Sequence, residues 1–173
     1  MNNRKYVIKL DDYKDYLKFI NIDIDKNCKW IYDIIDKKYN INKILYENKN
    51  FVLIMRRRMN PDKINTFHLL AFTKDKNIKS IRDLRNEHIP LLQEMVKKSK
   101  EYIKKKFNID KNEIEAHFDY PPTVLLLHIH FELANNKKFR KPLFEHSVNS
   151  VIENIRIDPD YYKKVKIEIM KKL

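Results

Sequence analysis

The chain contains no glycine among its 173 residues. A Walker-type loop and a dinucleotide-binding fingerprint both need glycine where the backbone comes close to a phosphate. The sequence therefore excludes both of these nucleotide-binding arrangements. Any phosphate site has to be built from side chains, helix ends and ordinary backbone amides.

The length of the chain fits a single compact domain that buries most of its apolar surface without disulfides or a structural metal. Cys28 is the only cysteine, so no intrachain disulfide and no cysteine-based zinc cluster can form. The N-terminus has no apolar stretch of secretory length, and no run of about 18 apolar residues occurs anywhere. We expect a soluble, cytoplasmic protein without a membrane partner.

The chain is strongly basic. It carries 37 Lys and Arg residues against 24 Asp and Glu residues, a formal net charge of +13. Such an excess is typical of proteins that bind a polyanion, such as nucleic acid or the phosphate chain of a nucleotide. The abundance of lysine, asparagine, isoleucine and tyrosine is also what AT-rich coding would produce, so the charge alone leaves both explanations open.

Hydrophobic periodicity predicts an α+β domain, in which strands joined as hairpins are accompanied by separate helices. Strands are expected at residues 5–10, 43–48, 51–58, 64–73, 113–120 and 123–133. Helices are expected at residues 28–38, 80–108, 146–155 and 158–173. The long helix has Pro90 near its first turn, and the last one follows an Asp-Pro start signal.

The segment TVLLLHIHFELA, residues 123–134, carries two histidines in an otherwise apolar strand. Side chains alternate across a strand, so Leu126, His128 and His130 share one face and the other face belongs to the core. Two adjacent imidazoles in an apolar environment repel each other when both are protonated. A phosphate between them would offset this cost, whereas isolated histidines such as His68 and His146 are expected to be ordinary core residues.

A metal site is the competing interpretation of the histidine pair, because neutral imidazoles ligate zinc well. His117 and Asp119 are near in sequence, but no third and fourth ligand follow at a regular spacing. We therefore expect neither a metal nor another cofactor.

The histidine segment resembles the alternating signature of the histidine triad (HIT) superfamily of nucleotide hydrolases and transferases. Five further segments narrow the resemblance to the C-terminal catalytic domain of the scavenger mRNA decapping enzyme family. They are WIYDIIDKK at 30–38, ILYEN at 44–48, FVLI at 51–54, SIRDLRNEHIPLL at 80–92 and VIENIRIDPDYY at 151–162. These segments keep their order from about residue 28 to residue 165, so most of the chain is covered.

The resemblance implies a homodimeric, HIT-like α+β fold with an antiparallel sheet. It also implies an enzyme that binds 7-methylguanosine-capped RNA or a cap analogue and hydrolyses the triphosphate bridge. His128 matches the family's nucleophile, which forms a nucleotidyl-histidine intermediate that water then cleaves. His130 matches the last histidine of the triad, which contacts phosphate oxygens or helps to protonate the leaving group.

The resemblance also assigns binding residues. Trp30, the only tryptophan, matches the aromatic that stacks on the methylated guanine, where the positive charge of the base adds a cation–π attraction of about 1–2 kcal/mol. Arg58 matches a phosphate-contacting lysine. Arg57 and Thr123 are expected to contact phosphate as well.

Three positions depart from the family pattern. Leu126 stands where the first histidine of the triad is expected. Asn40 and Arg56 stand where the family has a glutamate and an aspartate that read the edge of the guanine. These changes favour an alternative function, a protein that binds the mRNA cap without cutting it. A nucleotide hydrolase acting on dinucleoside polyphosphates or adenylates is a further alternative.

The resemblance also suggests a division of the chain. Residues 1–27 are interpreted as an N-terminal strand and helix extension, reduced relative to the family's N-terminal domain. Residues 28–173 are interpreted as the HIT-like cap-binding and catalytic domain.

Overall fold

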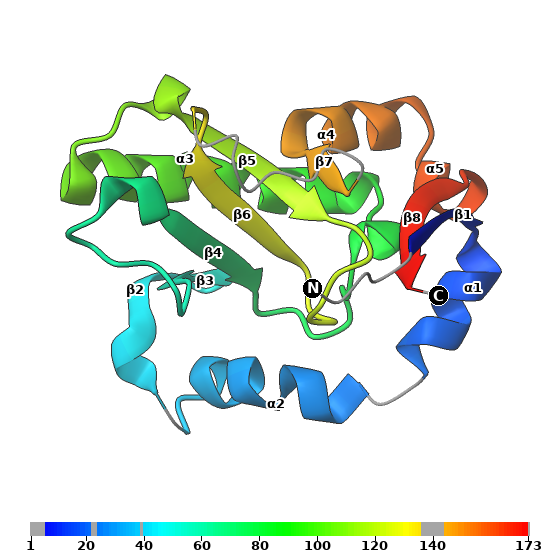
Figure 1. Ribbon diagram of the computed structural model, residues 1–173, viewed down its shortest axis with the longest axis horizontal. Coiled ribbons are helices and arrows are strands. Elements are labelled where there is room, and N and C mark those ends of the chain that lie inside the picture. Colours follow the sequence, from blue (N-terminus) through cyan, green and yellow to red (C-terminus); the bar gives the residue numbers. More distant parts are fainter. Residues whose placement is uncertain (1–5, 22–23, 39, 136–143, 173) are drawn as a thin grey trace.

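The structure is a computed structural model that describes residues 6–21, 24–38, 40–135 and 144–172 (Figure 1). Its strands are β1 (Tyr6–Asp11), β2 (Ile44–Glu47), β3 (Phe51–Met55), β4 (His68–Thr73), β5 (Ile114–Asp119), β6 (His128–Leu133), β7 (Glu145–Ser147) and β8 (Ile167–Lys172). Its helices are α1 (Tyr13–Ile20), α2 (Ile24–Ile35), α3 (Ile89–Phe107), α4 (Val148–Ile157) and α5 (Tyr161–Lys164). The predicted α+β class is confirmed.

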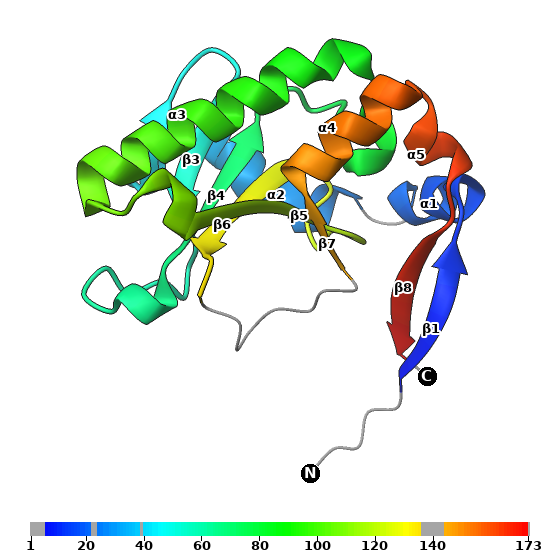
Figure 2. The ribbon, with the colours of Figure 1, turned by 90° about the horizontal axis from the view of Figure 1, so that it is seen from above.

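Six strands form an antiparallel sheet in the order β2-β3-β4-β6-β5-β7, and β1 pairs with β8 in a separate two-stranded ribbon. The ribbon lies to one side of the six-stranded sheet (Figure 2). Helices α3 and α4 lie over one face of that sheet (Figure 2). The main core fills the space between them and contains Ile129 and Phe131 of β6, Leu69 and Ala71 of β4, and Leu92 and Met95 of α3.

The opposite face of the sheet is covered by α2 over the β3 and β4 strands. A second core cluster forms there from Ile31 and Ile34 of α2, Val52 of β3 and Phe72 of β4. Figure 1 shows α2 on the side of the sheet away from α3 and α4. The same face continues over β6 and β5, where the pattern of side chains changes from apolar to histidine and carboxylate.

The long helix starts later than the sequence predicts. The expected helix over 80–108 is wrong for residues 80–88, which form two 3₁₀ turns, and α3 begins at Ile89. Ser80 caps the first turn through a reciprocal bond with Asp83, and Leu84 and Arg85 are extended between the turns. Such side-chain bonds to the backbone compete with continuous helix. The helix ends at Phe107, and the next residue, Asn108, has a positive φ of 56° in the left-handed cap position that glycine often fills.

The expected helix over 158–173 is also wrong. Only α5 is helical there, and the chain continues as β8, with Ile8 paired to Met170 and Leu10 paired to Glu168. Buried and exposed side chains alternate along β8, since Ile167 is buried in the main core and Glu168 is exposed. Pairing with β1, more than a hundred residues away in the sequence, makes this segment a strand.

Several smaller boundaries also differ from the expectation. β6 begins at His128 and not at residue 123, because residues 123–126 bend and the Leu127 amide donates to the Ile78 carbonyl. The expected helix over 146–155 begins two residues later, because residues 145–147 form β7 and Ser147 caps α4. Strands β2 to β5 lie within their expected segments, and β1 extends past its segment by Asp11 alone. Helix α2 begins at Ile24, four residues before the expected helix over 28–38, and ends at Ile35.

Arg82 is the largest fully buried side chain among the described residues, and it joins distant parts of the fold. Its Nε donates to the Tyr120 hydroxyl (2.9 Å), and its Nη1 donates to the Tyr162 and Val165 carbonyls (both 2.7 Å). Its Nη2 donates to the backbone carbonyl (2.7 Å) and the carboxylate (3.2 Å) of Asp11. All five guanidinium donors are therefore used, and β1 and the α5–β8 segment are fastened to the rest of the molecule.

Within the described ranges, no helix combines the length and the apolar character needed to cross a membrane. The chain division predicted at residues 27 and 28 stays a prediction, and β1 contacts the C-terminal part of the chain through β8.

Replacement of Arg82 by methionine is expected to destabilise the protein by about 3–5 kcal/mol, because it leaves the buried Asp11 carboxylate without its cation. The free energy of unfolding is measured by urea denaturation. Arg156→Met is the matched control, since Arg156 forms an exposed ion pair with Glu153, whose loss costs at most about 1 kcal/mol. Equal losses in the two variants would contradict the role given to Arg82.

Candidate active site

The register of the sheet gathers four buried histidines on the face that α2 leaves uncovered. His130 of β6 lies directly opposite His117 of β5 and Leu70 of β4, which places His68 one diagonal step away. The ring centroids of His117 and His68 each lie 5.1 Å from that of His130, and the ring centroid of His128 lies 4.9 Å from it. We call these four residues the histidine cluster.

His128 is held in one tautomer. Its Nδ1 lies 2.8 Å from the Leu126 carbonyl oxygen, which can only accept, so Nδ1 carries the proton. Burial lowers the pKa of His128, which keeps the ring neutral near pH 7. The Nε2 lone pair is then available for attack on an electrophile. The backbone of Leu126 orients the ring, although its side chain is not the histidine that the family pattern has.

A chain of hydrogen bonds fixes the tautomer of His130 as well. The Glu132 carboxylate lies 2.5 Å from Nδ1 of His68, so that nitrogen donates, and in a neutral His68 ring the Nε2 then accepts. His130 Nδ1 lies 2.8 Å from this Nε2 and donates to it. In this arrangement of neutral rings, the Nε2 of His130 carries no proton. Burial holds the pKa of His130 well below its ordinary value, which is consistent with a neutral ring.

Arg56 contacts the same chain. Its Nη1 lies 3.0 Å from His68 Nδ1, which cannot accept while it donates to Glu132. The bond to the carboxylate is the shorter one and is charge-assisted, so Arg56 serves chiefly as a countercharge. Burial alone would raise the pKa of Glu132, but the hydrogen bond from His68 and the nearby positive charges outweigh it and lower this pKa.

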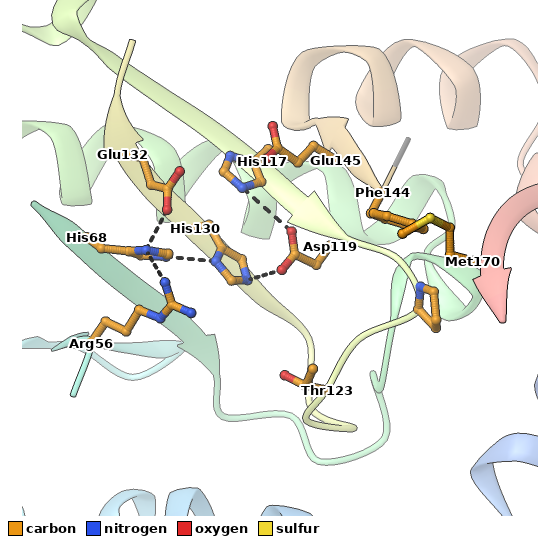
Figure 3. A pocket seen from close by; sticks show the side chains of 11 residues that line it. Arg56, His68, His117, Asp119, Thr123, His130, Glu132, Phe144, Glu145 and Met170 are labelled. Atoms are coloured by element: carbon orange, nitrogen blue, oxygen red, sulfur yellow. Dashed lines mark hydrogen bonds and ion pairs between the residues drawn. The ribbon is translucent and has the colours of Figure 1, made fainter. Parts of the chain in front are cut away.

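A cavity of about 370 Å³ opens beside the histidine cluster (Figure 3). Arg56, His68, His117, Asp119, Thr123 and His130 are among the residues that line it. The Asp119 carboxylate faces two histidines, with Oδ2 3.5 Å from His130 Nε2 and Oδ1 3.7 Å from His117 Nε2. The cavity thus combines cationic, anionic and neutral nitrogen groups within a small space.

Some of the binding residues expected from the sequence lie at this cavity. Arg56 and Thr123 line it, and His130 lies in its wall. His128 lies next to His130 and stacks on Phe72, with ring centroids 4.5 Å apart. Trp30 of α2 is 41% exposed and sets its ring edge-on to Phe72 at 5.7 Å, so an aromatic row runs from Trp30 to His128.

Other expected residues do not line the cavity. Arg57 and Arg58 are exposed in the turn after β3. Asn40 takes a left-handed conformation (φ 56°) before a short 3₁₀ turn. Their roles in base and phosphate binding stay predictions.

Sequence reasoning missed two members of the histidine cluster. It took His68 for a core residue, and His68 is buried but hydrogen-bonded within the site. It also treated His117 as an unsupported metal ligand. Each lies in a segment correctly predicted as a strand, but only the pairing of β4, β6 and β5 brings both to the same face as His130.

The antiparallel α+β domain with a histidine pair on a central strand has the HIT-like fold that the sequence predicted. The chain belongs to the scavenger mRNA decapping enzyme family, because the family model described as "Scavenger mRNA decapping enzyme C-term binding" matches residues 29–142.

The chain is also similar to enzymes named m7GpppX diphosphatase. It is 31% identical over 166 residues to the one from Rattus norvegicus, and this alignment covers 89% of this chain and 47% of that protein. It is 29% identical over 179 residues to the one from Ascaris suum, covering 94% of this chain and 60% of that protein. The chain thus spans about half the length of the curated relatives it matches.

Among solved structures, the aprataxin ortholog Hnt3 from Schizosaccharomyces pombe is 16% identical, with a TM-score of 0.44 over 71% of each chain. A TM-score below 0.5 at this identity says nothing about function.

The free energy of unfolding is expected to fall as the pH is lowered from about 7 to about 5. Because the pKa of His128 and that of His130 lie below the ordinary 6.5, the unfolded chain binds more protons than the folded chain once the pH drops below that value. Each such proton makes the free energy of unfolding change by up to about 1.4 kcal/mol more per pH unit. Urea denaturation at several pH values measures this dependence.

The double variant His128→Gln, His130→Gln is the comparison for this experiment. Its slope should be shallower, and His146, whose pKa burial also lowers, accounts for part of what remains. If wild type and the double variant lose stability equally between these pH values, the buried histidines are not the groups that titrate.

Proposed function

We propose that this chain hydrolyses the triphosphate bridge of a 7-methylguanosine cap, with His128 as the nucleophile. The observation that carries the proposal is the tautomer of His128. Its proton is held on Nδ1 by the Leu126 carbonyl, and its Nε2 lone pair is unprotonated in a neutral ring. Membership of the decapping family and the name m7GpppX diphosphatase of the relatives support this substrate.

In the proposed first step, the Nε2 lone pair of His128 attacks the phosphorus next to the methylated nucleoside. A nitrogen–phosphorus bond forms as the bond to the bridging oxygen breaks, and the rest of the cap leaves as a 5′-diphosphate. Water then attacks the nucleotidyl-histidine, which releases 7-methylguanosine monophosphate and restores the neutral imidazole. Two displacements with moderate barriers replace a single difficult one.

Phosphate binding in this proposal falls to the cavity beside His130. Arg56 and Thr123 line it and can donate to phosphate oxygens. A polyanion in the cavity favours the protonated form of His130, which would then donate from Nε2 to an oxygen of the bridge. The basic turn with Arg57 and Arg58 follows Arg56 directly and would attract the substrate over a longer range.

Base binding in this proposal falls to Trp30. Its ring is partly exposed and is held edge-on by Phe72, which itself stacks on His128. A methylated guanine lying on Trp30 would be close to the nucleophile along this aromatic row. The positive charge of the base would add a cation–π attraction to ordinary stacking.

Cap binding without hydrolysis is the second candidate function. Leu126, Asn40 and Arg56 replace family residues that contact phosphate or the guanine edge, and this is the observation that favours it. The two functions differ in whether His128 performs chemistry, so one experiment separates them.

The variant His128→Ala is expected to release no 7-methylguanosine monophosphate from cap dinucleotide while retaining affinity for it, because the nucleophile is lost and the aromatic and basic contacts remain. Chromatography measures the product, and quenching of the Trp30 fluorescence measures binding. His88→Ala, altered at the start of α3 away from the cavity, should keep wild-type turnover.

Two results would contradict the proposal. Turnover by His128→Ala at the wild-type rate would remove His128 from the mechanism. Quenching without any product in the wild-type protein would support the cap-binding alternative.

The variant Trp30→Leu is expected to weaken binding of methylated cap dinucleotide by about 5–30-fold, which corresponds to a cation–π contribution of about 1–2 kcal/mol. Binding of the unmethylated dinucleotide should change much less. Calorimetry measures both, since the variant has no tryptophan. The control is Phe19→Leu, because Phe19 is also an exposed aromatic residue but lies on α1. An equal loss for both ligands would argue against recognition of the methylated base by Trp30.

A further inference from the structure

We propose that His117, Asp119 and His130 form a binding site for a divalent cation of the zinc class. These residues come from the neighbouring strands β5 and β6, and their ligand atoms all lie within 4.8 Å of one another. The inference does not depend on the proposed decapping activity.

The two distances from the carboxylate to the imidazoles are close to the ligand–ligand distances around a tetrahedral ion. Bonds of about 2.0–2.1 Å to zinc place tetrahedral ligands about 3.3–3.4 Å apart. Asp119 Oδ2 lies 3.5 Å from His130 Nε2, and Oδ1 lies 3.7 Å from His117 Nε2. The two imidazoles are directly opposite each other across the paired strands, with their planes at 16°. Small side-chain rotations, without a change in the backbone, would complete the coordination.

The unsatisfied Nε2 of His130 gives an independent reason for a cation. This atom is buried and makes no hydrogen bond among the described residues. It lies 3.5 Å from Oδ2 of Asp119, a distance longer than an ordinary hydrogen bond. A metal ion between the ring nitrogen and the carboxylate would satisfy both groups.

The surroundings of His130 are those of a metal ligand. Histidines that bind metals usually donate their second ring nitrogen to a carboxylate or another acceptor, which fixes the ring and raises its basicity. Here His130 donates to His68, and His68 donates to Glu132. The chain Glu132–His68–His130 thus orients the Nε2 of His130 toward Asp119. His68 and Glu132 are positioning residues in this site.

The donor set indicates the kind of ion. Two imidazole nitrogens and one carboxylate oxygen suit zinc and other late divalent transition metals better than magnesium or calcium, which prefer oxygen ligands. Three protein ligands leave a fourth position open. That position faces the cavity that Arg56 also lines, so water or a phosphate oxygen could complete the coordination.

The test uses the whole protein, stripped of metal with a chelator and titrated with zinc alone by calorimetry. We expect one zinc ion per chain to bind in the wild type, and a cobalt-loaded sample to show the visible absorption of a tetrahedral site. Asp119→Asn and His117→Gln should each lose this binding. His68→Gln should weaken it by about 10–100-fold, the usual effect of removing a residue that orients a ligand.

Glu115→Gln is the matched control, because Glu115 is an exposed carboxylate on β5 two residues before His117. It should bind zinc as the wild type does. Circular dichroism of each variant shows whether a lost site reflects a lost fold. The inference is wrong if the wild type binds no zinc, if folded Asp119→Asn binds it with unchanged affinity, or if magnesium competes equally with zinc.

Discussion

The pairing of β6 with β4 and β5 is the constraint on which the site depends. Because side chains alternate across a strand, a slip of one residue would move His128 and His130 into the apolar core and bring Ile129 to the cavity. The register is protected by the main core on the other face, where Ile129 and Phe131 are fully buried against α3 and α4. The burial of one face therefore fixes the chemistry of the other.

Buried hydrogen bonds then convert this arrangement into defined protonation states. A backbone carbonyl accepts from His128, and burial lowers the pKa of both His128 and His130, which favours neutral rings. In a neutral His128 the Nε2 is unprotonated, and the same holds for His130 when a neutral His68 accepts from its Nδ1. The two lone pairs have different surroundings. That of His128 belongs to a ring stacked on Phe72 in the aromatic row, and that of His130 faces a carboxylate. Nucleophilic attack suits the first, and binding of a proton, a phosphate or a cation suits the second.

The sequence predicted the sheet well and the C-terminal part poorly. Strands β2 to β5 are predicted by β-rich segments that turn residues separate, and both features are local properties of the sequence. The last sixteen residues have the composition of a helix, yet β8 forms because β1 offers a partner, and Arg82 fastens both to the rest of the molecule. The prediction also failed for residues 80–88, where side-chain hydrogen bonds to the backbone replace the hydrogen bonds of a continuous helix. Local patterns carry no information about such partners.

The sequence alone determined that no glycine-rich phosphate loop can form, that the fold is α+β, and that His128 and His130 share one face of an apolar strand. The period of two along a strand is sufficient for that last point. Only the tertiary structure decided that His68, His117 and Asp119 join them, since these residues lie on other strands and their distance from His130 depends on sheet order and register. Tautomers and pKa shifts follow from burial and from neighbours remote in sequence, so they too belong to the tertiary structure.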